Sequence, residues 1–204
     1  MSDVAEVIVA GLVGYVVGMF PSADVVTRVA TRGQVDIRGS GSGNPGGLNA
    51  MRVVGRKWGL VVIVLDAAKG ALAGLLGIVI AGDAGAYTAA TAAIAGHCFP
   101  AWARFRGGKG VAAAGGSFAT VFPPMFVIGG LVAGTSSLVT KNSELAMWIT
   151  CTVWVVGALV WVVADLPNAW GPAPDAGMLV YSGVGAAMIL GKFRAAARAG
   201  VQAL

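Results

Sequence analysis

The chain has 204 residues, of which 57% are hydrophobic and 11% are charged, and its mean hydropathy is +0.80. Roughly a quarter of the residues of a soluble domain are charged, so the composition excludes a soluble globular domain and indicates a polytopic all-α membrane protein. We predict a single domain, residues 1–204. The net charge of +5 does not indicate nucleic-acid binding, because the basic loops are expected to face a bilayer surface.

The first apolar segment, residues 4–20, is predicted to be a membrane-spanning helix. A signal peptide is disfavoured, because Asp3 and Glu6 lie where a signal peptide carries positive charge. The many glycines of the apolar segments favour close packing between membrane helices. Cys98 and Cys151 fall within such segments without metal-ligand spacing, so we interpret both as ordinary buried thiols.

A basic loop, residues 27–58, follows the first helix. Short loops rich in Lys and Arg stay in the cytoplasm, so this loop predicts an N-terminus on the outer side of the membrane. The basic residues of the loop are Arg28, Arg32, Arg38, Arg52, Arg56 and Lys57.

Within this loop, residues 36–52 read DIRGSGSGNPGGLNAMR and are predicted to bind a phosphate. Closely spaced glycines allow positive φ angles and leave backbone N–H groups uncovered, which is the geometry of an anion-binding nest. Ser42 and Asn44 add side-chain donors, and Arg38 and Arg52 flank the loop with guanidinium groups suited to a phosphate. A flexible Gly/Ser linker is the alternative. A nucleotide-hydrolysing P-loop is disfavoured, because no Gly-Lys-Ser/Thr ending is present.

A second helix is expected over residues 59–81, followed by a turn at Asp83 and a returning helix over residues 86–103. Asp66 and Lys69, spaced i and i+3, occupy one face of the second helix at membrane depth. Ionisable groups there must pair or face a polar cavity. They are therefore either part of a functional site or a structural ion pair that joins helices.

Residues 96–110, GHCFPAWARFRGGKG, form a second glycine-rich basic segment that is predicted to lie on the same side as the first. Gly107, Gly108, Lys109 and Gly110 precede the next helix, where free N–H groups, the helix dipole and a lysine favour a phosphate or oxyanion. His97 is the only histidine of the chain and is expected near this level. The alternatives are a structural histidine and a lysine that extends to the membrane interface.

Residues 110–140 would form a helix about 45 Å long, too long for a hydrocarbon core of about 30 Å. Pro123-Pro124 is therefore predicted to divide the segment into two short or tilted helices. Helices over residues 145–163 and 178–190 complete a map of about seven spans, with the C-terminus in the cytoplasm. On this map no Lys or Arg lies outside, whereas five acidic residues do: Asp3, Glu6, Asp83, Asp165 and Asp175.

Together these motifs resemble the bacterial acyl-phosphate-dependent glycerol-3-phosphate acyltransferases of the PlsY type. The family's internal Asp-x-x-Lys-Gly, its Gly-His-x-Phe-Pro and its Gly-Gly-Lys-Gly-Val occur here in the same order, at residues 66–70, 96–100 and 107–111. The family pattern D-I-R-x-x-G-S-G-N-x-G-A-T-N-x-x-R is matched by Asp36, Ile37, Arg38, Gly41, Ser42, Gly43, Asn44, Gly46, Asn49 and Arg52.

Two departures from the family pattern stand out. Gly47-Leu48 replaces Ala-Thr, which removes a hydroxyl from the loop, and the C-terminal segment GKFRAAARAG lacks the family's Asn and Glu. Two alternatives to the enzyme therefore stay open: a catalytically altered member that binds lipid precursors, and a transporter of a small phosphorylated solute. Broken helices and a midmembrane Asp-Lys pair also occur in transporters.

The resemblance implies transfer of a fatty acyl group from acyl phosphate to the 1-hydroxyl of sn-glycerol 3-phosphate, giving lysophosphatidic acid and inorganic phosphate. It implies a multi-pass protein of the bacterial inner membrane, in contact with lipid, with its active site on the cytoplasmic side and no cofactor or metal. Ser42, His97 and Lys109 are expected to be catalytic, with His97 positioning or transferring a proton, and Asp66 and Lys69 to support the site. The expected substrate- and phosphate-binding residues are Arg38, Gly41, Gly43, Asn44, Gly46, Asn49, Arg52, Gly107, Gly108 and Gly110.

Overall fold

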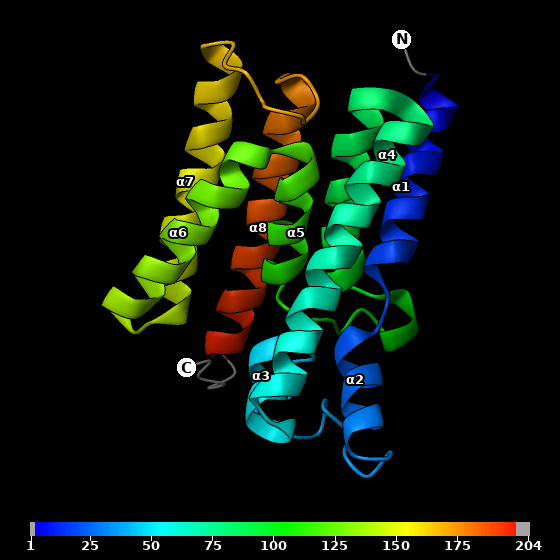
Figure 1. The fold of residues 1–204 in the computed structure, drawn as a ribbon, viewed down its shortest axis with the longest axis vertical. Helices are drawn as coiled ribbons and strands as arrows, with labels where there is room; N and C mark the ends of the chain where they lie inside the picture. Colours follow the sequence, from blue (N-terminus) through cyan, green and yellow to red (C-terminus); the bar gives the residue numbers. More distant parts are fainter. Residues whose placement is uncertain (1–2, 199–204) are drawn as a thin grey trace.

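A computed structural model describes residues 3–198 and shows an all-helical bundle (Figure 1). Within this range no residue is in a β-strand. Residues 1–2 and 199–204, at the two ends of the predicted single domain, lie outside the described range. The helices are α1 (Val4–Gly18), α2 (Ser22–Ala30), α3 (Gly47–Val54), α4 (Arg56–Cys98), a 3₁₀ turn (Ala101–Ala103), α5 (Val111–Val121), α6 (Pro123–Thr140), α7 (Ser143–Val163) and α8 (Ala176–Arg198).

Helix α4 is a hairpin of two membrane-spanning arms. Its φ/ψ angles leave the helical region at Ala81 and Gly82, where Gly82 has a φ of 58°, so the turn falls next to the predicted position at Asp83. The two arms lie side by side (Figure 1), and a Cβ at Gly77 would overlap the carbonyl oxygen of Gly85 on the opposite arm. Glycine at both positions lets the arms approach this closely.

The double proline separates α5 from α6, as predicted. Helix α5 ends at Val121, and Pro123 and Pro124 form the first turn of α6, where the missing N–H of proline costs no hydrogen bond. Helix α5 has 11 residues, so it is about 16 Å long and covers about half of a 30 Å hydrocarbon core. It is visibly shorter than its neighbours α4 and α8 (Figure 1).

Five segments are long and apolar enough to cross a membrane by length and composition. One of these segments contains both arms of α4, and the apolar helix α5 is too short to be counted among the five. Counted separately, α1, the two arms of α4, α5, α6, α7 and α8 are the predicted seven helices. The predicted seven-helix architecture is therefore confirmed, whereas its orientation in the membrane stays a prediction.

Several helix boundaries differ from those predicted. The basic loop over residues 27–58 contains α3 and the first residues of α4, which begins at Arg56 instead of Gly59. The second arm of α4 ends at Cys98 instead of Ala103, because Pro100 disfavours helical geometry at the residue before it, Phe99. Helix α8 continues beyond the predicted Leu190 to Arg198, so the basic residues Lys192, Arg194 and Arg198 lie within the helix.

Small residues pack the helices around the site. A Cβ at Gly14 or Gly18 of α1 would overlap backbone atoms of α4, and a Cβ at Gly116 of α5 would overlap Ala67. This arrangement confirms the packing role predicted for the glycines. The largest core cluster lies among α4 to α8 and contains Tyr87, Trp154 and both cysteines, which are buried free thiols.

Candidate functional site

The two glycine-rich loops meet at one end of the bundle. The first glycine-rich loop (residues 31–46) connects α2 to α3, and the second (residues 99–110) connects α4 to α5. They enclose a cavity of about 590 Å³ together with α8, which we call the loop cavity. Its lining residues are Arg38, Ser42, Gly43, Asn44, Pro45, Trp102, Ala103, Arg104, Phe105, Arg106, Gly107, Lys109, Lys192, Ala195 and Ala196.

Asn49 holds the first glycine-rich loop in shape. Its side-chain oxygen accepts a hydrogen bond from the backbone N–H of Ser42 (2.8 Å), and its amide donates to the carbonyl oxygens of Ile37 (3.3 Å) and Ser40 (3.0 Å). The side chain is buried. Asn49 therefore shapes the loop and does not line the loop cavity.

Two glycines give the loop its curvature. Gly41 and Gly43 have φ angles of 59° and 68°, in a region that residues other than glycine rarely adopt. A Cβ at Gly41 would also overlap the side-chain oxygen of Asn49. Of the phosphate ligands predicted in this loop, Ser42, Gly43 and Asn44 line the loop cavity, whereas Gly41 and Gly46 support its backbone.

Arg38 lines the loop cavity, but its guanidinium group binds protein atoms. Its Nε and Nη2 donate to the two carboxylate oxygens of Asp24 at 2.6 and 3.0 Å. Its Nη1 donates to the carbonyl oxygen of Arg106, and the group lies 5.0 Å from the ring centroid of Trp102. Arg38 thus ties α2 to both glycine-rich loops.

In the second glycine-rich loop, two backbone amides are also used by the protein. The N–H groups of Gly107 and Gly108 donate to the carbonyl oxygens of Cys98 and His97, both at 3.1 Å. A Cβ at Gly108 would overlap the imidazole of His97, so glycine lets the loop lie against this ring. These two amides therefore position the loop and are not free phosphate donors.

Lys109 extends into the loop cavity. Its Nζ lies 4.1 Å from the ring centroid of Phe193 on α8. Gly110, which follows it, has a φ of 85° and is the N-cap of α5. Burial, followed by the positive charge of Arg52, lowers the pKa of the Lys109 ammonium, whereas Glu144 opposes this shift. Arg52 is exposed on the last turn of α3 and does not line the loop cavity.

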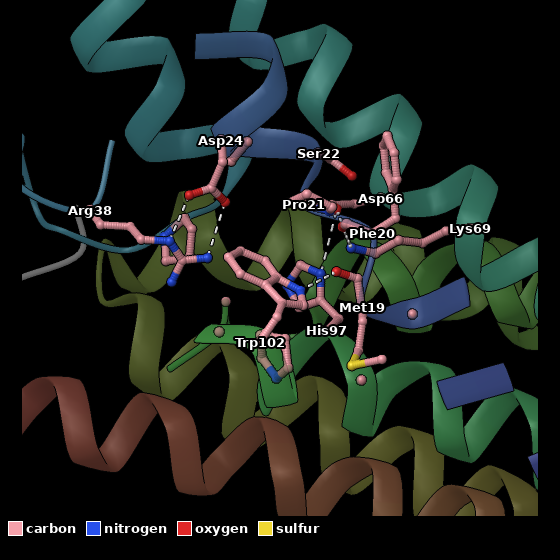
Figure 2. Close-up of a pocket in the computed structure, with 17 residues that line it drawn as sticks. Met19, Phe20, Pro21, Ser22, Asp24, Arg38, Asp66, Lys69, His97 and Trp102 are labelled. Carbon is pink, nitrogen blue, oxygen red and sulfur yellow. Dashed lines mark hydrogen bonds and ion pairs between the residues drawn. The ribbon is translucent and has the colours of Figure 1, made fainter. Parts of the chain in front are cut away.

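Asp66, Lys69 and His97 form a buried ionic cluster (Figure 2). Their exposed fractions are 2%, 7% and 8%. One oxygen of Asp66 lies 2.8 Å from Lys69 Nζ and 3.4 Å from His97 Nδ1. Lys69 Nζ also donates to the carbonyl oxygen of Phe20 at 3.0 Å, between α1 and α2. The i and i+3 pair predicted from the sequence is present.

The ionic cluster borders a second, smaller cavity of about 20 Å³. This cavity shares a wall with the loop cavity, made of Arg38, Pro45, Trp102 and Gly107. His97 therefore lies on the opposite side of this wall from Ser42 and Lys109. Within residues 3–198, no group of three or more His, Cys, Asp or Glu side chains comes together to hold a metal ion.

Several residues of the site were not predicted from the sequence, among them Asp24, Trp102 and Lys192. Asp24 lies in α2 without a motif around it, and Trp102 lies within the second glycine-rich loop, where only the glycines, His97 and Lys109 were singled out. Lys192 lies in the C-terminal segment GKFRAAARAG, from which no site residue was predicted. Leu48, by contrast, is 61% exposed, so its departure from the family pattern removes no group from the loop cavity.

The comparisons with known proteins agree with this architecture. Residues 8–201 match the family model described as glycerol-3-phosphate acyltransferase. The chain is 39% identical over 158 residues to a glycerol-3-phosphate acyltransferase of Syntrophotalea carbinolica, covering 76% of this chain and 79% of the relative. It is 37% identical over 149 residues to glycerol-3-phosphate acyltransferase 2 of Bacillus cereus, covering 73% and 74%.

Two crystal structures of PlsY (YgiH), an integral membrane glycerol 3-phosphate acyltransferase, share this fold. The glycerol 3-phosphate form superposes with a TM-score of 0.75 at 28% identity. The lysophosphatidic acid form gives 0.76 at 27%, and both alignments cover 97% of this chain and 94% of PlsY. The fold and the site thus define an integral membrane protein of the acyltransferase class. The chain belongs to the glycerol-3-phosphate acyltransferase family.

Proposed function

We propose that this protein transfers a fatty acyl group from acyl phosphate to the 1-hydroxyl of sn-glycerol 3-phosphate, giving lysophosphatidic acid and inorganic phosphate for phospholipid synthesis. The main support is the loop cavity, because both glycine-rich loops and α8 contribute cationic and hydrogen-bonding groups to it. The reaction brings together two phosphate-bearing substrates, and the cavity combines Lys109 and Lys192 with Ser42 and Asn44. Membership of the family supports the same reaction.

The proposed chemistry requires no covalent enzyme intermediate. The hydroxyl oxygen of glycerol 3-phosphate attacks the acyl carbonyl carbon, the bond from that carbon to the phosphate oxygen breaks, and the hydroxyl proton ends on the released phosphate. Acyl phosphate is a mixed anhydride with a good leaving group, so positioning and charge stabilisation supply most of the acceleration. Lys109 stabilises the charge that develops on the acyl phosphate. Ser42, Gly43 and Asn44 bind phosphate or hydroxyl groups, and Arg52 adds positive charge near Lys109.

His97 and Arg38 are assigned positioning roles. The imidazole of His97 lies against Gly108 and next to Asp66, and its carbonyl oxygen holds the backbone of the second glycine-rich loop just before Lys109. Arg38 fixes the first glycine-rich loop through Asp24. Because both residues act on the loops, they affect the reaction through the placement of Ser42 and Lys109.

We further propose that the protein lies in the inner membrane of a bacterial cell and that the loop cavity faces the cytoplasm. The support is charge segregation: the cations of both glycine-rich loops and of α8 gather around one cavity, and basic regions favour the cytoplasmic side. Acidic residues mark the opposite end of the bundle, where the carboxylate of Asp83 accepts a hydrogen bond from the backbone of Ala173 at 3.0 Å.

Acyl transfer by the purified protein tests the function. Glycerol 3-phosphate is supplied with either acyl phosphate or acyl-CoA, and lysophosphatidic acid is measured. We expect product when the donor is acyl phosphate and no product when it is acyl-CoA. Ser42→Ala should lose most of the product formed with acyl phosphate. Ser40→Ala is the matched control, because Ser40 lies in the same loop but does not line the loop cavity. Folded protein that gives no product with either donor would favour a lipid-precursor binder or a transporter.

The rate is expected to fall at alkaline pH. Anion stabilisation requires the protonated Lys109 ammonium, and burial together with Arg52 lowers its pKa below the ordinary value of 10.5. The Lys109 ammonium therefore loses its proton at a lower pH than an exposed lysine does, and the rate decreases over the same pH range. A pH–rate profile compares the native protein with Lys109→Arg, whose guanidinium stays protonated up to about pH 12. The alkaline decrease should move to higher pH in the variant, and an unchanged profile would assign the titration to another group.

A further inference from the structure

The C-terminal part of α8 forms the third wall of the loop cavity. Lys192, Ala195 and Ala196 line it from this helix. This wall exists because α8 remains helical to Arg198. The C-terminal segment lacks the Asn and the Glu of the family pattern, so the charged side chains of this part of α8 are lysine and arginine.

Lys192 is the cation that α8 directs to the loop cavity. Its Nζ donates to the carbonyl oxygen of Cys98 at 3.0 Å and lies 5.0 Å from the ring centroid of Phe99. An ammonium has three donors, so two remain for an anion. The contact with Cys98 at the end of α4 fixes where the positive charge sits.

The other cations of α8 do not line the loop cavity. The guanidinium of Arg194 lies 4.8 Å from the ring centroid of Trp148 on α7, which turns it away from the loops. Arg198 is exposed in the last turn of the helix. Among the described basic residues of α8, Lys192 alone can therefore meet a ligand in the cavity.

The first glycine-rich loop and α8 contribute different groups to the lining of the loop cavity. Ser42 and Asn44 of the first glycine-rich loop offer hydrogen-bonding groups, as the hydroxyls of a glycerol phosphate require. On α8, the other lining residues are Ala195 and Ala196. The second glycine-rich loop contributes the exposed ring of Phe105 together with Arg104 and Arg106. A phosphate bound at Lys192 thus has an apolar surface beside it.

We propose that Lys192 binds the phosphate of the acyl-bearing substrate, while Ala195 and Ala196 contact the beginning of its acyl chain. This inference rests on the proposed function, since it divides the loop cavity between the two substrates of that reaction. Lys109 contacts α8 as well: its ammonium lies 4.1 Å from the ring centroid of Phe193, the residue next to Lys192. Lys192 is then a substrate-binding residue that compensates for the missing polar groups of the C-terminal segment.

The test compares Lys192→Gln with Arg194→Gln in lipid nanodiscs. Glutamine removes the charge but keeps a donor for the carbonyl oxygen of Cys98, so the end of α4 stays supported. We expect KM for acyl phosphate to rise about tenfold or more in Lys192→Gln, because a hydrogen bond to a charged group is lost, while KM for glycerol 3-phosphate changes little. Arg194→Gln should behave like the native protein, and Lys192→Arg should recover part of the affinity.

Direct binding separates this inference from the proposed function. n-Dodecyl phosphate carries a phosphate and an alkyl chain but no transferable acyl group, and its affinity is measured by calorimetry beside that of glycerol 3-phosphate. A selective loss of dodecyl phosphate affinity in Lys192→Gln supports the inference even if the native protein gives no product. Unchanged affinity for dodecyl phosphate, or a loss confined to glycerol 3-phosphate, overturns it.

Discussion

Replacing Lys109 with glutamine is expected to lower kcat for acyl transfer about 100- to 1,000-fold, the range seen when one stabilising group for a developing anion is removed. The Lys109 ammonium rests on the ring of Phe193 in the loop cavity, and glutamine cannot carry the positive charge. Initial rates at saturating glycerol 3-phosphate and acyl phosphate give the effect on kcat.

Lys57→Gln is the matched control for this experiment. Lys57 is an exposed lysine in the first turn of α4, and its Nζ lies near the ring of Trp58, outside the loop cavity. This variant should keep the native kcat. If Lys109→Gln raised only KM and left kcat unchanged, Lys109 would bind the ground state of a substrate and would have no catalytic role.

The second large effect is expected on stability. Replacing Lys69 with methionine should lower the free energy of unfolding by about 3–5 kcal/mol, the usual cost of removing one partner from a buried ion pair. Asp66 would keep a buried negative charge with only His97 beside it. The hydrogen bond from Lys69 to the carbonyl oxygen of Phe20, which joins α4 to the segment between α1 and α2, would also be lost.

A double replacement distinguishes the ionic contribution from simple loss of packing. In Asp66→Asn/Lys69→Met no buried charge is left unpaired by the loss of the lysine, so the double variant should be more stable than Lys69→Met alone. Unfolding is followed by tryptophan fluorescence in detergent, with the exposed Lys57→Met as the reference. Equal stability of the single and double variants would mean that the cluster contributes no net ionic stabilisation.

The membrane architecture was predictable because it depends on hydropathy and a few strong local signals. Apolar length gave the spans, and the double proline at 123–124 gave the division between α5 and α6. The extent of α8 was underestimated because the prediction followed hydropathy, which falls after Leu190. After Gly191, five of the seven residues 192–198 (KFRAAAR) are Ala or Arg and one is Lys, all good helix formers, and their propensity would have extended the helix to Arg198.

The residues of the candidate site were predictable only in part, and their partners were not predictable. Ser42, Asn44 and Lys109 do line one cavity, as their motifs indicated. The sequence could not show that Arg38 already binds Asp24, or that the amides of Gly107 and Gly108 bind carbonyl oxygens at the end of α4. A residue type fixes how many hydrogen bonds a group can make, whereas its partner depends on segments that only the fold brings together.

The short length of α5 bears on how a lipid-like substrate reaches the reacting groups. Because α5 is about 16 Å long, a loop attached to its end can lie below the headgroups of a bilayer whose apolar layer is about 30 Å thick. Moving an acyl chain from lipid into water costs about 0.8 kcal/mol for each methylene group. A loop that carries Lys109 at this depth lets the carbonyl carbon react while most of the chain remains in the hydrocarbon. The bilayer itself then acts as the storage compartment for the acyl chain.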